Sequence, residues 1–262
     1  RAWHRLAPDR RRIVAANLAR VCAATGRPTA GAPFRAMVQA SFVEHARYWL
    51  EVLRAPHYRP AQLEAMVRAE GWDDLEPIFR SGVVVAVAHL GNFEPFGSFM
   101  EVRGLRGIAP VEETRPAALY EFLLKRRIVG GRGIRLVPLS RVMRPMLAAL
   151  RQGQIVALAA DRDLAGDGLP VTIFGHATTL PAGPATLALR TGRPLLVASV
   201  LRTGRERFHG RAWAVEVARS GDLRADVVAM TAALAARFEA IIGEAPEQWW
   251  GAFQPFWSDQ RR

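Results

Sequence analysis

The residues best suited to chemistry lie in one short stretch, where an acid follows a histidine five positions later. Residues 89–94 read HLGNFE, with His89 first and Glu94 last. An imidazole can take a proton from an alcohol, and an acid that accepts a hydrogen bond from its other ring nitrogen fixes the tautomer. We therefore predict that His89 is a general base and that Glu94 orients its ring.

The spacing of this pair requires a turn. On one continuous helix, five residues rotate by about 500°, which puts the two side chains on different faces. Gly91-Asn92 supplies turn chemistry, and Pro95 suits the first turn of a following helix. His4 and Asp9 have the same spacing without a preceding strand. The spacing alone is therefore weak evidence, and a structural histidine at the end of a strand is the alternative.

The elements that must position this stretch alternate between strand and helix. Val83–His89 is an apolar run between two glycines, as is typical of a buried strand. Further strands are expected at Gly107–Val111, Ile134–Leu139, Gln154–Ala160, Val171–Phe174, Leu195–Leu201 and Ala212–Val217, the last two as a hairpin across Arg202–Arg211. Helices are expected at Ala61–Ala69, Asp73–Arg80, Pro95–Val102, Arg115–Val129, Arg141–Arg151, Pro181–Thr191 and Ala225–Gly243.

This alternation predicts an α/β fold with a mostly parallel central sheet and helices on both faces. Apolar stripes at helical spacing before the first strand predict a helical N-terminal layer. We expect a single domain over residues 1–262, with the helical layer at about 1–80 and the α/β core at about 81–262.

Other acidic residues follow the predicted strands directly. Glu112 comes after the second strand, and Asp161 and Asp163 flank Arg162 after the fourth. Ligands of such sheets sit at the carboxyl ends of the strands. The sequence thus predicts a histidine base with acidic partners and an arginine at one edge of the sheet.

The composition limits the possible partners. The chain has 36 basic and 24 acidic residues, a formal net charge of +12, which favours nucleic acid, an anionic membrane surface or phosphorylated ligands. A basic nucleic-acid-binding module is the non-enzymatic alternative, but the arginines are spread along the chain and no known binding motif is present, so no nucleic acid is expected. The only cysteine, Cys22, excludes a disulfide scaffold, and the histidines lack metal-ligand spacing, so no metal is expected.

Several motifs together resemble a known family. Residues 89–94 resemble the HxxxxD/E block of glycerolipid acyltransferases, and more narrowly the H-x-G-N-W/F-D/E block of bacterial lipid A biosynthesis acyltransferases. Residues 11–21 and 44–51 are similar to that family's N-terminal helices, and residues 246–250 and 254–257 to its C-terminal block. Residues 160–164 and 180–185 resemble the branch that acylates phosphatidylinositol mannosides.

The resemblance implies an acyl-CoA-dependent O-acyltransferase, with acyl-CoA as co-substrate and no bound cofactor. His89 would deprotonate a sugar hydroxyl, Glu94 would orient His89, and the oxygen would attack the thioester without an acyl-enzyme. The supporting positions implied by the family are Glu112, either Arg126 or Arg127, and either Asp161 or Asp163.

The resemblance also implies the acceptor and the location. Lipid A members usually begin with a membrane-spanning helix, whereas the apolar runs of this sequence are far shorter than the ~20 residues needed. We therefore expect a membrane glycolipid acceptor, most simply a phosphatidylinositol mannoside, with a lipid A precursor or a lysophospholipid as alternatives. The expected location is peripheral, on the anionic cytoplasmic face of the plasma (inner) membrane.

Three aromatic or basic features allow two interpretations each. Arg10–Arg12 with Trp3 is either an interfacial anchor or an ordinary amphipathic helix. Phe34, Phe42 and Trp49 either line an acyl-chain groove or belong to the core. The C-terminal cluster either caps the core or dips into the headgroup region; it consists of Trp249, Trp250, Phe253, Phe256 and Trp257.

Overall fold

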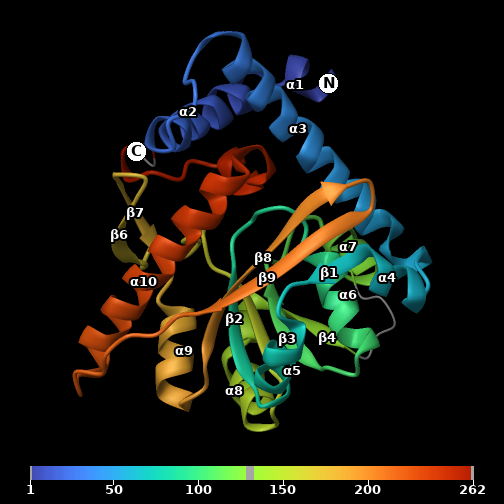
Figure 1. Cartoon of the computed structure of the whole chain (residues 1–262), viewed down its shortest axis with the longest axis vertical. Coiled ribbons are helices and arrows are strands. Elements are labelled where there is room, and N and C mark those ends of the chain that lie inside the picture. Colours follow the sequence, from blue (N-terminus) through green and yellow to red (C-terminus); the bar gives the residue numbers. More distant parts are fainter. Residues whose placement is uncertain (1, 128–132, 261–262) are drawn as a thin grey trace.

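A seven-stranded sheet forms the centre of the computed structural model, which describes residues 2–127 and 133–260 (Figure 1). The strand order is β1-β9-β8-β2-β5-β3-β4. The strands are β1 Val67–Ala69, β2 Val83–Val87, β3 Gly107–Val111, β4 Ile134–Pro138, β5 Ile155–Ala159, β8 Leu195–Gly204 and β9 Arg207–Ala214. All neighbours are parallel except β8 and β9, which confirms the expected mostly parallel sheet.

Helices precede the sheet and cover both of its faces. The N-terminal layer contains α1 Ala2–Leu6, α2 Pro8–Ala24, α3 Gly31–Arg54, α4 Pro60–Met66 and α5 Trp72–Arg80. The later helices are α6 Glu94–Val102, α7 Ala117–Arg127, α8 Met143–Arg151, α9 Gly183–Thr191 and α10 Leu223–Glu244. Short 3-10 turns lie at Ala55–His57, Leu139–Arg141, Pro246–Gln248, Trp250–Phe253 and Ser258–Gln260. None of the helices in this described part of the chain is long and apolar enough to cross a bilayer.

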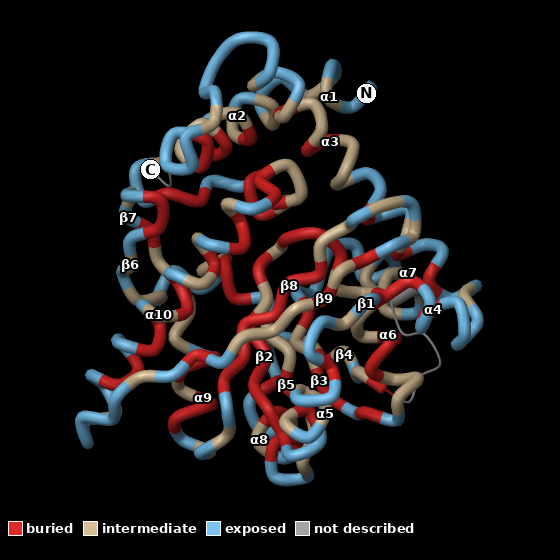
Figure 2. Tube along the Cα trace, in the orientation of Figure 1, coloured by how far each residue is buried: buried red, intermediate tan, exposed pale blue. Residues whose placement is uncertain are grey.

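The central strand β2 joins the two halves of the core. Its side chains alternate between the faces, as in any strand. Val84 packs in a cluster with residues of α2, α8, α9 and α10, whereas Val85 packs in a cluster with residues of α4, α5 and α6. Figure 2 shows the resulting concentration of buried residues along β2. A strand buried on both faces has no polar face, which explains why Val83–Val87 is uniformly apolar.

Two expectations about the strands are wrong, and a third is confirmed with different bounds. Val67–Ala69 was expected as the end of a helix but forms the edge strand β1, because it pairs with residues 208–210 of β9. Val171–Phe174 was expected in the main sheet, but β6 (Leu169–Ile173) pairs only with β7 (His176–Leu180), in a separate antiparallel hairpin. The expected hairpin at the end of the sheet is confirmed, but β8 and β9 extend through much of Arg202–Arg211.

The two termini of the described chain pack together. Trp3 of α1 stacks on Phe253 at 5.2 Å between ring centroids and meets the edge of Phe42 at 4.7 Å. Asn17 of α2 donates hydrogen bonds to the carbonyls of Ala252 and Gln254. The C-terminal segment (red in Figure 1) therefore lies against the N-terminal helices. It caps the core, since Trp249, Phe256 and Trp257 are buried.

Candidate active site

The turn that carries His89 links β2 to α6. Gly91 adopts a positive φ of 61°, and a Cβ there would lie 2.0 Å from the carbonyl oxygen of Val200, so only glycine fits. The backbone N–H of Asn92 donates to that same carbonyl at 3.0 Å. Helix α6 then begins at Glu94, with Pro95 in its first turn. The expected turn and helix start are confirmed.

The ring of His89 is held by Asp161. Strands β2 and β5 are parallel neighbours in which Val87 pairs with Ala159, and each delivers the residue two positions later to the same edge. Nδ1 of His89 lies 2.5 Å from Oδ1 of Asp161, and Asp161 is fully buried. With Asp161 ionised, Nδ1 carries the proton and the lone pair of Nε2 is left for chemistry. Nε2 has no hydrogen-bond partner among the described residues, and His89 lines a cavity.

The surroundings of Asp161 keep it ionised. Burial disfavours its charge, but the neighbouring His89 and the hydrogen bonds from His89 and Trp249 outweigh burial and lower the pKa of Asp161. The indole N–H of Trp249 donates to Oδ2 at 3.1 Å. Each carboxylate oxygen of Asp161 thus has a donor of its own.

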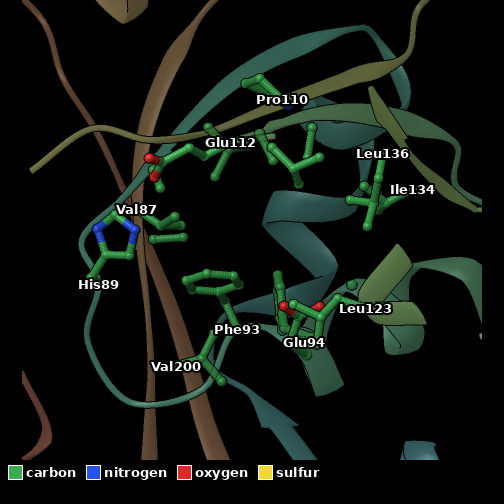
Figure 3. Close-up of a pocket in the computed structure, with 18 of the residues that line it drawn as sticks. Val87, His89, Phe93, Glu94, Pro110, Glu112, Leu123, Ile134, Leu136 and Val200 are labelled. Carbon is green, nitrogen blue, oxygen red and sulfur yellow. The ribbon is translucent and has the colours of Figure 1, made fainter. Parts of the chain in front are cut away.

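Glu94 does not orient His89, contrary to the expectation. Among the described residues, the ring of His89 donates its hydrogen bond to Asp161, and no hydrogen bond joins His89 to Glu94. Figure 3 shows His89 and Glu94 on opposite sides of the Phe93 ring. Glu94 instead accepts a hydrogen bond from the hydroxyl of Tyr48 at 3.3 Å. The reason is the helix start: Glu94 is the first residue of α6, and its side chain is directed toward α3 rather than back to the strand.

An apolar cavity of about 340 Å³ opens beside His89 (Figure 3). Side chains of β2, β3, β4, β5 and β8 line it, together with side chains of α3, α6 and α7. The apolar lining includes Val85, Val87, Phe96, Met100, Ala109, Leu123, Leu124, Ile134, Leu136, Ile155, Ala157 and Val200. The polar residues are few, among them Glu94, Glu112 and Arg162. A largely apolar cavity with a few polar groups suits a ligand with a long hydrocarbon part.

The other candidate residues do not all lie at the cavity. Glu112 follows β3 and lines the same cavity as His89. Asp163 is turned away: it accepts hydrogen bonds from the backbone N–H groups of Gly166 and Gly168 and from the hydroxyl of Thr179 at 2.7 Å. Of the two aspartates, Asp161 is therefore the partner of His89. Arg126 and Arg127 end α7, and their side chains lie outside the described residues.

Aromatic residues far away in the sequence complete the wall around His89. The ring of Trp250 meets His89 edge-on with 4.5 Å between centroids and stacks on Tyr48 at 4.6 Å. Trp49 lines the cavity, whereas Phe42 is buried in the core, so the expected aromatic stripe is divided between the two roles. The contacts of Tyr48 and Trp250 carry no sequence signal of their own, because their partners belong to other elements.

A second network fixes the loop from the opposite side. Asn92 accepts from the backbone N–H of Glu94 and donates through Nδ2 to Glu51 of α3 at 2.6 Å. Arg202 of β8 forms ion pairs with Glu51 and Glu44. Burial works against the charge of Arg202, but its hydrogen bonds and ion pairs with the two glutamates outweigh burial and raise its pKa. The N-terminal layer is thereby tied to the turn that carries the histidine.

A histidine paired with a buried aspartate beside an apolar cavity, on a mostly parallel sheet, fits an enzyme that transfers an acyl chain. The chain belongs to the bacterial lipid A biosynthesis acyltransferase family, whose model matches residues 1–257. Phosphatidylinositol mannoside acyltransferase of Mycobacterium tuberculosis (strain ATCC 25618 / H37Rv) is 35% identical over 261 residues, which cover 94% of this chain and 78% of that protein. The protein of the same name from Mycolicibacterium smegmatis is 34% identical over 259 residues, 94% of this chain and 80% of that one. The resemblance noted in the sequence is confirmed, and the chain is an acyltransferase.

Proposed function

We propose that this enzyme transfers a fatty acyl chain from acyl-CoA to a hydroxyl of a phosphatidylinositol mannoside. The observation that carries the proposal is the His89–Asp161 pair at the edge of an apolar cavity. The acceptor is taken from the relatives, which are named for that substrate class. The net charge of +12 is consistent with two phosphate-bearing substrates.

The chemistry follows from the tautomer of His89. Nε2 takes the proton of the acceptor hydroxyl while its oxygen attacks the carbonyl carbon of the thioester. The tetrahedral intermediate collapses, the C–S bond breaks, and the leaving thiolate takes the proton from Nε2. Asp161 holds Nδ1 and stabilises the transient imidazolium by its negative charge. No acyl-enzyme is needed, because the acceptor itself is the nucleophile.

The apolar cavity is the place for the acyl chain. Its lining of valine, leucine, isoleucine and phenylalanine side chains offers dispersion contacts and little competition from water. Glu112 and Arg162 line the same cavity and are suited to polar contacts with the sugar or the phosphates. Arg126 and Arg127 remain candidates for phosphate contacts from the sequence alone.

A membrane-facing surface surrounds the cavity. Large apolar side chains are exposed on α3 and α7, two helices that pack together, and Trp49 and Leu123 of these helices line the cavity. The exposed members are Trp49, Leu50, Leu53, Leu119 and Phe122. Apolar side chains in a basic protein suit peripheral binding to an anionic bilayer. These side chains support the proposal of peripheral membrane binding, and the cytoplasmic face of the plasma membrane is the location that we propose.

One mutation tests the proposed chemistry. His89→Ala removes the base and is expected to lower the turnover of acyl-CoA with phosphatidylinositol mannoside by about 10²–10⁴-fold, with unchanged circular dichroism. His57→Ala, at an exposed histidine outside the cavity, is the matched control. Full activity of His89→Ala would overturn the mechanism. Mass spectrometry of products from phosphatidylinositol mannoside, a lipid A precursor and a lysophospholipid, each offered with acyl-CoA, decides the acceptor.

A second experiment tests the membrane surface. Leu50→Asp with Phe122→Asp is expected to reduce binding to vesicles that contain phosphatidylinositol, because two exposed apolar anchors become charged. Val228→Asp, at an exposed apolar residue of α10 outside the cavity lining, should bind as the wild type does. Equal binding of all three proteins in a sedimentation assay would contradict the assignment of this surface.

A further inference from the structure

The C-terminal segment Gln248–Gly251 runs across the loop that carries His89. The backbone N–H of Gly91 donates to the carbonyl of Gln248 at 3.0 Å. In the other direction, the N–H of Gly251 donates to the carbonyl of His89 at 3.1 Å. Leu90 and Trp249 pair as an antiparallel bridge between these contacts. The backbone of the histidine is thus fixed by a segment about 160 residues further along the chain.

The side chain of Trp249 reaches past this backbone to Asp161. Its Nε1 lies 3.1 Å from Oδ2, and both side chains are fully buried. Gly251 makes the approach possible: a Cβ there would lie 2.4 Å from Nε1 of Trp249 and 2.6 Å from Oδ2 of Asp161. The carboxylate is therefore clamped between one donor on Oδ1, which is His89, and one on Oδ2, which is Trp249.

We infer that Trp249 is a positioning residue of this site, whose indole N–H fixes Oδ2 of Asp161 so that Oδ1 is aimed at Nδ1 of His89. The inference rests on the proposed function, in which His89 is the general base. Trp249 does not line the cavity and so acts only through Asp161. A buried carboxylate with one unsatisfied oxygen would be free to rotate and poorly solvated, and the indole prevents both.

The indole also sets the pH at which the base becomes available. The active form of the pair has Asp161 ionised and His89 neutral, and acid inactivates it by adding one proton. The positive end of the indole N–H dipole lies beside the carboxylate and opposes this added proton. Removing the N–H therefore makes protonation of the pair more favourable, whichever residue holds the proton. The pKa of the pair should rise, and the acid limb of the activity profile should move to higher pH.

Other titratable and charged groups lie around the cavity and the loop, and they stay the same in the variants. They are His45, Tyr48, Glu44 and Glu51 of α3, Glu94 and Glu101 of α6, Glu112 after β3, Tyr120 of α7, Arg162 after Asp161, Arg202 of β8 and Arg10 of α2. Because a tryptophan-to-phenylalanine change alters none of these charges, a displaced acid limb reports on the lost N–H.

The experiment compares two buried tryptophans of the C-terminal cluster, Trp249 and Trp257. Trp249→Phe removes the donor, whereas Trp257→Phe makes the same change at an equally buried tryptophan whose Nε1 has no hydrogen-bond partner among the described residues. The readout is the pH profile of kcat/KM with acyl-CoA and phosphatidylinositol mannoside. For Trp249→Phe we expect an acid limb displaced upward by about one pH unit and a plateau lowered by about tenfold. For Trp257→Phe the limb should stay in place.

Each outcome separates this inference from the proposed function. A Trp249→Phe limb that coincides with the wild-type limb overturns the inference, even if the plateau falls, because a packing role lowers the plateau without moving the limb. Activity that survives in His89→Ala overturns the proposed function instead. If Trp249→Phe does not fold, β-(3-benzothienyl)alanine at position 249 keeps the ring size and lacks the N–H, and the same two outcomes apply.

Discussion

Two carboxylates flank the loop that carries His89, and their surroundings differ sharply. Asp161 is fully buried and holds the imidazole and an indole N–H, one on each oxygen. Glu94 is half-buried and binds the hydroxyl of Tyr48. Glu94 is five positions from the histidine in sequence, whereas Asp161 is its neighbour across two parallel strands. The register of the sheet, not proximity along the chain, decides which acid orients the base.

Asp161→Asn should have the largest effect, because it changes the carboxylate that orients His89. An amide can present its NH₂ group to Nδ1, which favours the wrong tautomer, and it provides no negative charge for the imidazolium. We expect kcat to fall by about 10³-fold with little change in KM. Asp163→Asn is the matched control, since its carboxylate binds Gly166, Gly168 and Thr179 outside the cavity. Comparable losses of kcat in both variants would contradict the assignment of Asp161 as the acid that orients His89.

Glu51→Gln tests the region on the Glu94 side, where the loop is tied to α3. The side chains of Arg202 and Glu51 are only 8% and 11% exposed, so loss of one charge leaves the other poorly compensated. We expect the free energy of unfolding, measured in urea, to fall by about 3 kcal/mol. The control is Arg54→Gln, on the same helix as Glu51, which breaks an exposed pair with Glu206 of the β8–β9 turn and should cost under about 1 kcal/mol. If the free energy of unfolding fell by similar amounts in the two variants, the buried network would contribute no more to stability than the exposed ion pair.

His45 extends the comparison, because it is a half-buried imidazole that has no hydrogen bond to a carboxylate in the described part of the chain. Its Nε2 accepts a hydrogen bond from the indole N–H of Trp49. Burial, followed by the charges of Arg10 and His89, lowers its pKa from 6.5 to about 4. Between pH 6.5 and about 4 the unfolded chain binds the extra proton and the folded chain does not. This histidine therefore lowers stability progressively as the pH falls through that window.

The effect of His45 can be measured as a difference between proteins. His45→Phe keeps an aromatic ring and removes the titrating group. Between pH 7 and pH 4, the free energy of unfolding of this variant should therefore fall by about 2–3 kcal/mol less than that of the wild type. His57→Gln, at an exposed histidine, should follow the wild-type curve. A His45→Phe curve parallel to the wild-type curve would contradict the lowered pKa.

The sequence predicts the parts of the fold that are encoded locally. The buried run of β2, the glycine turn and the start of α6 are correct, because apolar patterning and turn chemistry act over a few residues. The edge strand β1 was missed because its three residues are a strand only through their pairing with β9. Long-range pairing of that kind leaves no local signal.

The same limit applies to the site. Asp161 was one of two candidate aspartates, and the choice between it and Asp163 required the register of β2 and β5. The turn chemistry and the family resemblance predict Glu94 as the orienting acid, but its side chain, at the first position of α6, bonds to Tyr48, and the ring of His89 bonds to Asp161. In the sequence, Trp249 belongs to an aromatic cluster and to the C-terminal block that resembles the family. Its partner lies 88 residues away, so only the folded chain brings the two together.

Glu94→Gln should have the smallest effect. The amide oxygen can still accept from the hydroxyl of Tyr48, and the loss of a negative charge at the N-terminus of α6 costs of the order of 0.5 kcal/mol. We expect kcat/KM to fall by less than about tenfold and the acid limb of its pH profile to stay in place, because the ring of His89 keeps Asp161 as its partner. A loss of kcat as large as that of Asp161→Asn would mean that Glu94 acts on the reacting groups themselves. In that case Glu94 would assist His89 in the reaction, a role that the register of the sheet assigns to Asp161.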